Sequence, residues 1–142
     1  RPNEIGGIMG RSQLKRLDQN VARRTHHLMR FLEQIDAKKY RTDFKLEGSS
    51  NYAFNLVLNE ADDVLVERLM KTMRDAGVEF RRGSAGGGNQ LRQPYLKGVV
   101  PDGYHRQFPH TEHIHFYGFY IGNFPDLRDD EVDALCKILN AV

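Results

Sequence analysis

The apolar residues of the first 37 positions recur every three or four residues, and this run constrains the fold more than any other feature. Such spacing places apolar side chains on one stripe of a helix. Asn3 is a suitable N-terminal cap, and Pro2 just before it is compatible with a helix start. The pattern therefore predicts one long helix over residues 3–37. The stripe consists of Ile5, Ile8, Leu14, Leu17, Val21, Leu28, Phe31, Leu32 and Ile35.

Three glycines, Gly6, Gly7 and Gly10, lie in the first turns of this predicted helix. Each one costs roughly 1 kcal/mol of helix stability relative to alanine. Their clustering indicates close approach by another backbone or by a partner subunit. The alternative interpretation is a frayed or broken start of the helix.

Basic side chains decorate the same helix, and a solvated polar face explains them better than a nucleic-acid surface. The whole chain has 21 basic and 19 acidic residues, so its net charge is only +2. Aromatic residues do not interleave with these charges, as they do in single-strand-binding surfaces. We therefore expect no nucleic-acid partner. The basic residues are Arg11, Lys15, Arg16, Arg23, Arg24, His26, His27 and Arg30.

The length of 142 residues suits one domain with its own core. Cys136 is the only cysteine, so an internal disulfide is excluded. A reducing, cytoplasmic setting fits, although a cysteine-poor secreted protein would look the same. No apolar run approaches the length of a membrane span, so we expect no membrane partner. Because the chain opens at Arg1 with what reads as a helix start in mid-sequence, we expect a fragment of a longer protein.

A strand, a helix and a second strand are predicted after the long helix. Residues 52–58 alternate in the manner of a strand with one strongly apolar face. Asp62 or Asp63 opens a helix, and Gly77 is a natural residue to end it. Val78 to Arg82 is short and extended, so these elements form a strand–helix–strand unit with a parallel crossover.

The last third of the chain adds one more strand and one more helix. Residues 97–111 contain scattered proline and glycine and are expected to form an ordered loop. Residues 114–121 are apolar and aromatic, which predicts a strand, and a helix is expected over residues 128–140. The fold class is therefore α+β: a long N-terminal helix followed, over residues 51–142, by a small mixed β-sheet packed with two helices.

The stretch from Ala85 to Pro94 is the best candidate for a ligand-binding loop. Its three consecutive glycines let the backbone come close to another group. Asn89, Arg92 and Gln93 follow with amide and guanidinium donors, so a polar ligand and a plain surface loop are equally good interpretations. Arg81 leads into this loop, and its guanidinium fork suits a carboxylate or phosphate. Together these residues indicate an anionic ligand.

Four histidines, His105, His110, His113 and His115, fall close together in the sequence. His113 and His115 would share one face of the predicted strand, where a metal site is conceivable. The spacing matches no strong zinc pattern, so we expect no metal and interpret the histidines as polar residues beside a cleft or on the surface. One of them could serve in proton transfer. No complete catalytic constellation is present in the sequence.

Several motifs together resemble one family, the DegT/DnrJ/EryC1/StrS group of pyridoxal-phosphate-dependent enzymes of nucleotide-sugar metabolism. The resemblance covers nearly the whole chain, and in its second half it is strongest to the sugar 3-dehydratase branch. In the first half the matching residues are Arg1, Pro2, Glu4, Gly7, Gly10, Gln13, Leu14, Leu17, Arg23 and Arg24. In the second half they are Gly77, Val78, Arg81, Ala85, Gly86, Asn89, Arg92 to Tyr95, Gly118 to Asn123, Pro125 and Leu127.

This resemblance implies the small C-terminal domain of a fold-type-I enzyme whose N-terminal, cofactor-binding domain is absent from the chain. It implies a nucleotide-sugar substrate, an amino-acid amino donor, pyridoxal or pyridoxamine phosphate as cofactor, and a homodimer at full length. The catalytic lysine or histidine belongs to the absent domain, so we expect no catalytic residue and no tightly bound cofactor in this fragment. Arg1 is carried over as a cofactor-binding residue, and the substrate-binding residues are Arg81, Asn89, Arg92 and Gln93.

The chain departs from the dehydratase branch at one place. That branch usually reads Ala-Gly-Asn, whereas Gly87 and Gly88 lengthen the loop here. Both reactions therefore stay open: 3-dehydration of a keto-deoxy sugar, with a histidine as acid and base, or transamination, with a lysine. Either would serve deoxysugar or surface-polysaccharide biosynthesis. The alternative from another class is a stand-alone α+β module that binds a small anionic ligand.

Overall fold

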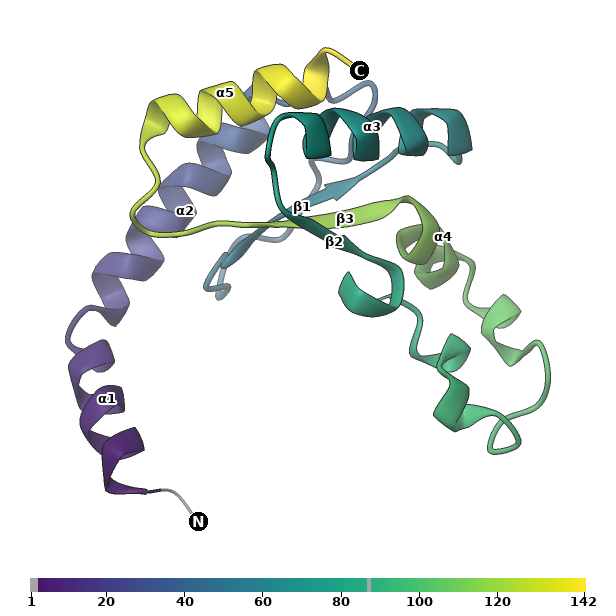
Figure 1. Ribbon diagram of the computed structural model, residues 1–142, viewed down its shortest axis with the longest axis horizontal. Coiled ribbons are helices and arrows are strands. Elements are labelled where there is room, and N and C mark those ends of the chain that lie inside the picture. Colours follow the sequence, from purple (N-terminus) through teal and green to yellow (C-terminus); the bar gives the residue numbers. More distant parts are fainter. Residues whose placement is uncertain (1–2, 87) are drawn as a thin grey trace.

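The computed structural model describes residues 3–86 and 88–142, and it confirms the α+β class (Figure 1). A small sheet lies at the centre. Helices α3 (Asp63–Asp75) and α5 (Asp129–Asn140) lie over one of its faces, and α2 (Leu17–Gln34) packs against α5 and the first strand. The other face of the sheet carries none of these three helices.

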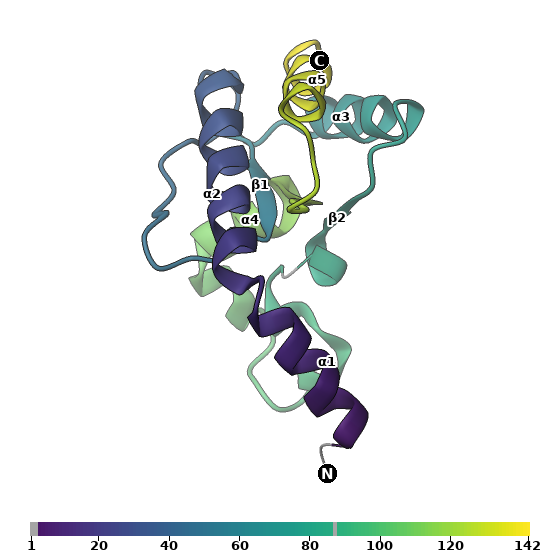
Figure 2. The ribbon, with the colours of Figure 1, turned by 90° about the vertical axis from the view of Figure 1, so that its left-hand side faces the viewer.

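The single long helix predicted for residues 3–37 is wrong, because a turn at Lys15 and Arg16 divides it into α1 (Glu4–Leu14) and α2. Neither residue is a helix breaker, so the periodicity gave no sign of the turn. The cap was predicted correctly, since the Asn3 side chain accepts a hydrogen bond from the amide of Gly6 at 2.8 Å. Helix α1 buries no residue and extends away from the rest of the molecule (Figure 2).

The strand–helix–strand unit is confirmed in its elements. Strand β1 (Ala53–Val57) precedes α3, and β2 (Phe80–Arg82) follows it. The side chain of Asp62 caps α3 by accepting from the amide of Leu65 at 2.9 Å. Gly77 follows the end of α3 with φ +69°, a left-handed conformation that favours glycine. Local capping signals of this kind are readable in sequence because they involve neighbouring residues.

The prediction of a mixed sheet is wrong, because both strand pairs are antiparallel. The strand order is β1-β3-β2, where β3 is Gly118–Gly122. Strands β1 and β2 run in the same direction, as the crossover requires, but β3 lies between them and pairs with each. The register aligns Asn55, Tyr120 and Arg81 in one row across the sheet. These three side chains therefore share one face.

Residues 114–117 are helical, so the predicted strand over residues 114–121 is wrong in its first half. Helix α4 (Pro109–Tyr117) begins with proline at its first position and carries Glu112 in its first turn, both of which favour a helix start. Short apolar runs fit helix and strand equally well, so the sequence did not separate them. His113 and His115 accordingly lie on a helix. Four short 3₁₀ segments precede α4: η1 (Gly83–Gly86), η2 (Gln90–Arg92), η3 (Pro94–Leu96) and η4 (Tyr104–Gln107).

One hydrophobic core joins α2, α3 and α5 to the covered face of the sheet. Phe31 and Phe54 stack at its centre, with ring centroids 4.8 Å apart. Tyr40 is buried at the edge of the core and donates its hydroxyl to the carbonyl of Leu139 at 2.7 Å. Because these side chains cover one face of the sheet, the opposite face is left for a ligand. Other fully buried members are Leu56, Leu58, Leu69, Met73, Val132 and Cys136.

Candidate functional site

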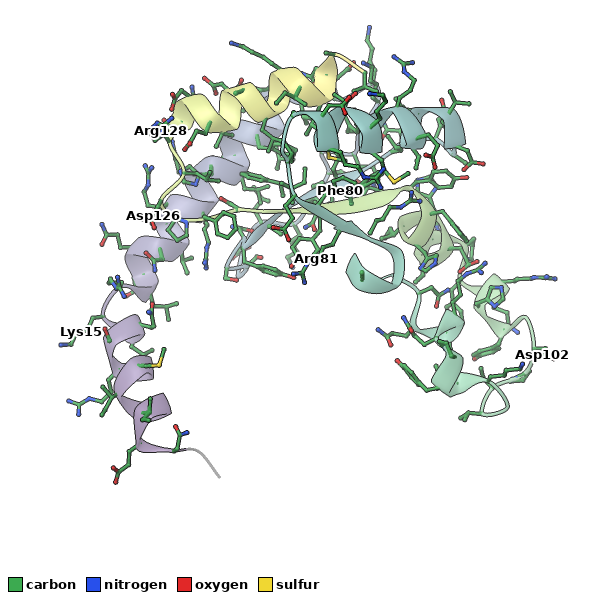
Figure 3. All side chains as sticks on the ribbon, in the orientation of Figure 1. Lys15, Phe80, Arg81, Asp102, Asp126 and Arg128 are labelled. Atoms are coloured by element: carbon green, nitrogen blue, oxygen red, sulfur yellow. The ribbon has the colours of Figure 1, made fainter. Side chains whose placement is uncertain are left out.

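The open face of the sheet carries the row formed by Asn55, Tyr120 and Arg81. Figure 3 places Phe80 on the side of the sheet that α3 covers and Arg81 on the opposite side. The guanidinium carbon of Arg81 lies 6.0 Å from the centroid of the Tyr120 ring, which is within cation–π range. Within residues 3–86 and 88–142, no carboxylate lies at ion-pair distance from Arg81. This arginine is therefore ready to accept an anion.

A hollow of about 610 Å³ lies beside Arg81, between the edge of β2 and the start of α5. Its charged lining residues are Glu79, Arg81 and Glu131, and the rest of the lining is mainly apolar and aromatic. This volume is large enough for a small organic ligand. The other lining residues are Tyr52, Phe54, Gly77, Val78, Phe80, Tyr120, Ile121, Gly122, Phe124, Leu127, Val132 and Leu135.

Three aromatic side chains of this lining, Tyr52, Tyr120 and Phe124, form what we call the aromatic platform. The Tyr52 and Tyr120 rings meet edge to face, with centroids 5.7 Å apart. A Cβ added to Gly122 would lie 2.8 Å from the Phe124 ring, so only glycine lets that ring lie against the strand. Tyr52 is 60% exposed and Phe124 is 63% exposed. Large aromatic surfaces left this open are typical of binding sites.

Asn123 holds the platform in place, although it is only 1% exposed itself. Its side-chain amide donates to the carbonyls of Arg24 and Asn51, each at 2.8 Å, and its side-chain oxygen lies 3.2 Å from Nδ1 of His27. Its backbone amide donates to the carbonyl of Tyr52 at 2.9 Å. Tyr52 and the segment leading to Phe124 are thus fixed to each other and to α2. Sequence reasoning missed this role, because the partners lie far apart in the chain.

A second cluster connects the glycine loop to α4, and Asn89 is its buried centre at 2% exposed. The backbone amide of Asn89 donates to Nδ1 of His115 at 3.1 Å, and its side-chain amide donates to Oε1 of Glu112 at 2.7 Å. Its side-chain oxygen accepts from the amide of Leu91 at 3.0 Å and caps η2. All of these bonds are made within the chain, so Asn89 holds the loop against α4.

Arg92 and Glu112 form a bidentate ion pair in the same cluster. Nε of Arg92 lies 2.8 and 3.0 Å from the two carboxylate oxygens, and the guanidinium also lies 4.7 Å from the Phe116 ring centroid. The hydrogen bonds from Arg92 and Asn89 lower the pKa of Glu112 from 4.5 to about 2. Sequence reasoning missed Glu112; the only signal was its position three residues before His115, on one turn of α4.

Gly88 shows why glycine is needed in this loop. A Cβ there would lie 2.3 Å from Nδ1 of His115 and 2.7 Å from the carbonyl oxygen of Gly83. The Gly88 amide donates to that carbonyl at 2.7 Å, and Gly83 adopts φ +54°. The close approach expected of the glycine run is therefore present at Gly88. Gly87 lies outside the described residues.

The structure groups the predicted substrate-binding residues into two places. Arg81 lies on the open face of the sheet, beside the large hollow. Asn89 and Arg92 meet at Glu112, and Arg92 and Gln93 line a separate hollow of about 440 Å³. Arg1, the predicted cofactor-binding residue, lies outside the described residues.

The clustered histidines have separate surroundings. His113 donates from Nε2 to the carbonyl of Leu58 at 2.7 Å. Because Nδ1 of His115 accepts from Asn89, the neutral ring carries its proton on Nε2, and burial is the main cause that lowers the pKa of His115. In the part of the chain that the structure describes, no group of three or more His, Cys, Asp or Glu side chains could hold a metal ion. In the same part, no helix combines the length and apolarity needed to cross a membrane.

The hollow beside Arg81 does not fit a complete pyridoxal phosphate site. A Schiff base with pyridoxal phosphate forms on a lysine amine. In an enzyme that has a histidine in place of this lysine, the imidazole needs to reach the reacting carbon of the substrate. Neither residue type is present in the lining of this hollow. What the lining does offer is an arginine, aromatic rings and apolar surface, which suit part of a substrate.

Comparisons with known proteins give consistent matches along the chain. The model of the DegT/DnrJ/EryC1/StrS aminotransferase family matches residues 1–140. The chain is similar to the GDP-4-keto-6-deoxy-D-mannose 3-dehydratases of Escherichia coli O55:H7, at 25% identity, and Yersinia pseudotuberculosis, at 26%. These matches cover 98% of the chain but only 36% and 35% of the two relatives, so the chain spans about a third of their length.

Solved structures give the same result. A crystal structure of GDP-4-keto-6-deoxymannose-3-dehydratase, with a trapped PLP-glutamate geminal diamine, matches with a TM-score of 0.84 and 25% identity. That match covers 98% of this chain and 36% of the solved one. A putative sugar aminotransferase from Streptococcus pneumoniae matches with a TM-score of 0.81 over 98% of this chain and 34% of its own. Its identity is 16%, so it shows the fold alone.

Proposed function

We propose a function from one premise: the chain belongs to the DegT/DnrJ/EryC1/StrS aminotransferase family. It acts, in this proposal, as the small C-terminal domain of a longer pyridoxal-phosphate-dependent enzyme that converts nucleotide-linked keto-deoxy sugars. The observation that carries the proposal is the match of 98% of this chain to about a third of a 3-dehydratase, at a TM-score of 0.84. Such an enzyme would serve deoxysugar or surface-polysaccharide biosynthesis.

Two reactions fit this proposal, 3-dehydration and transamination. The relatives at 25–26% identity are named as 3-dehydratases, and this favours dehydration. The choice depends on one residue at the cofactor, a histidine or a lysine, which we place in the remainder of the enzyme. An amino acid would supply the amino group in either case.

Pyridoxal or pyridoxamine phosphate is bound, in this proposal, by the remainder of the enzyme, and it supplies an electron sink when bound. The residues of this chain bind and orient the substrate. Arg81 has no carboxylate at ion-pair distance among the described residues and offers its guanidinium to an anionic group, and its hollow excludes water from one side of the ligand. Asn89, Arg92 and Glu112 fix the glycine loop where it faces the substrate, and Gln93 presents an amide beside it.

Helix α1 is proposed to pack against the remainder of the enzyme. It has 11 residues, three of them glycine, and isolated helices of that length are marginal in water. Its apolar side chains are exposed; Ile5, Ile8 and Leu14 each keep 68–69% of their surface. Covering them would stabilise α1 and bring the open face of the sheet toward the cofactor. We propose a homodimer for the full-length enzyme and a cytoplasmic setting, in keeping with the free, buried thiol of Cys136.

The test uses the full-length protein that contains this chain. Purified with pyridoxal phosphate, it should show a cofactor absorption band and convert a GDP-linked 4-keto-6-deoxy sugar in the presence of glutamate. The 142-residue chain alone should bind no stoichiometric pyridoxal phosphate. A full-length protein without cofactor or turnover, whose isolated 142-residue chain binds a small anion tightly, would instead support the stand-alone binding module.

A further inference from the structure

We propose that Arg81 and the aromatic platform bind the nucleoside diphosphate part of the substrate. Arg81 takes the phosphates, and the platform of Tyr52, Tyr120 and Phe124 takes the base. This inference rests on the proposed function, because it names the part of the nucleotide sugar that this face of the domain recognises.

Arg81 differs from Arg82 and Arg92 in the groups that its guanidinium contacts. Arg82 donates to the carbonyl of Phe116 at 2.6 Å, and Arg92 is paired with Glu112. Among the described residues, Arg81 has no carboxylate at ion-pair distance. Its guanidinium carbon lies 6.0 Å from the centroid of the Tyr120 ring. A guanidinium in that state offers paired donors to phosphate oxygens without first breaking a bond in the protein.

The aromatic platform and Arg81 line the same hollow. Bases stack on tyrosine and phenylalanine rings, because every base has a flat π-face. The hollow of about 610 Å³ has Arg81 and all three platform rings in its lining. A ligand that combines a flat ring with an adjacent polyanion would therefore meet both features in one place.

The rings of the aromatic platform are held in place by the backbone around them. Asn123 fixes the backbone of Tyr52 at 2.9 Å, and Gly122 lets the Phe124 ring lie against β3. Tyr120 is held in the central strand of the sheet, with pairing on both sides. Rings held in this way lose little freedom when a base stacks on them, which favours binding.

The experiment measures binding to the full-length protein by isothermal titration calorimetry with three probes: GDP, guanosine and inorganic pyrophosphate. Arg81→Gln should weaken GDP and pyrophosphate about tenfold or more and leave guanosine unchanged, because it removes only the charge. Tyr120→Leu and Phe124→Ala should weaken GDP and guanosine about tenfold and leave pyrophosphate unchanged. Tyr120→Phe, which keeps the ring, should bind GDP nearly as the wild type does.

Arg68→Gln is the matched control, since Arg68 is an exposed arginine on α3 and outside the lining of the hollow. It should bind all three probes as the wild type does. If Arg81→Gln and Phe124→Ala are folded and bind GDP with unchanged affinity, the inference is overturned, even when the enzyme turns over a keto sugar. If these variants lose GDP binding but no nucleotide keto sugar is ever converted, the proposed function fails and the nucleotide site stands.

Discussion

Replacing Glu112 with glutamine should loosen the glycine loop and remove the part of its pH dependence that comes from the Glu112 carboxylate. The fall in the pKa of Glu112 from 4.5 to about 2 corresponds to an upper limit of about 3 kcal/mol of stabilisation of the folded state. The Glu112 side chain is 18% exposed and that of Arg92 is 32%, so water screens the pair and about 1–2 kcal/mol is expected. Glutamine keeps one acceptor but loses the charge and the bidentate pairing.

The assay is urea unfolding of wild type and Glu112→Gln between pH 3 and 8, with hydrogen exchange of the Asn89 and Leu91 amides as a local readout. A lowered folded-state pKa stabilises the fold fully above the unfolded value near 4.5, and this stabilisation is lost as the pH falls toward 2. The difference between the two proteins should therefore be largest at neutral pH and shrink below pH 4.5. Glu67→Gln, on the exposed side of α3, is the control. Equal stability at pH 7, or a difference that stays constant down to pH 3, would show that the Glu112 carboxylate does not stabilise the fold through its lowered pKa.

Three further changes test other contacts. Gly88→Ala should cost about 1–3 kcal/mol and break the bond from Asn89 to His115, because the new Cβ overlaps the imidazole; an unchanged Nδ1 chemical shift of His115 would contradict this. Asn123→Ala should cost about 2–4 kcal/mol, since it leaves buried carbonyls without donors, and chemical denaturation would measure it. Tyr40→Phe should cost about 1–2 kcal/mol through the lost hydroxyl bond in the core; a melting temperature equal to that of the wild type would show that this bond adds nothing.

The elements that were predictable are those whose signals are local. Asp62 and Gly77 marked the two ends of α3 because a cap and a left-handed glycine act on residues next to them in sequence. The turn at Lys15 and Arg16 carried no such signal, and the run before Gly118 was too short to separate helix from strand. The order of the strands in the sheet could not be predicted for another reason. It depends on which strands pair with each other, and those strands lie far apart in the sequence.

The candidate site also divides into residues with a local sequence signal and residues whose contacts lie far apart in the chain. Arg81 was predicted as a site residue from its position in or just after a strand that leads into the glycine loop, and the structure places it within β2. Arg92 was also predicted, but its partner Glu112 lies 20 residues away on α4, which the sequence did not predict as a helix, so the ion pair could not be foreseen. Asn123 and the platform were missed because their contacts join α2, β1 and the end of β3. Sequence patterns locate candidate hydrogen-bond donors, but they do not show which donors already have a partner within the protein.

The central place of β3 sets the order in which this domain can assemble. Strands β1 and β2 are separated in the sheet by β3, which begins 36 residues after the end of β2 in the chain. Neither strand therefore has a partner to pair with until Gly118–Gly122 is available. During synthesis, β1 and β2 therefore have no partner strand among the described residues until β3 has been made. Pairings over such distances are slow to close. In refolding followed by pulse-labelled hydrogen exchange, the amides of β1 and β2 should gain protection together, and protection of either strand well before β3 would contradict this order.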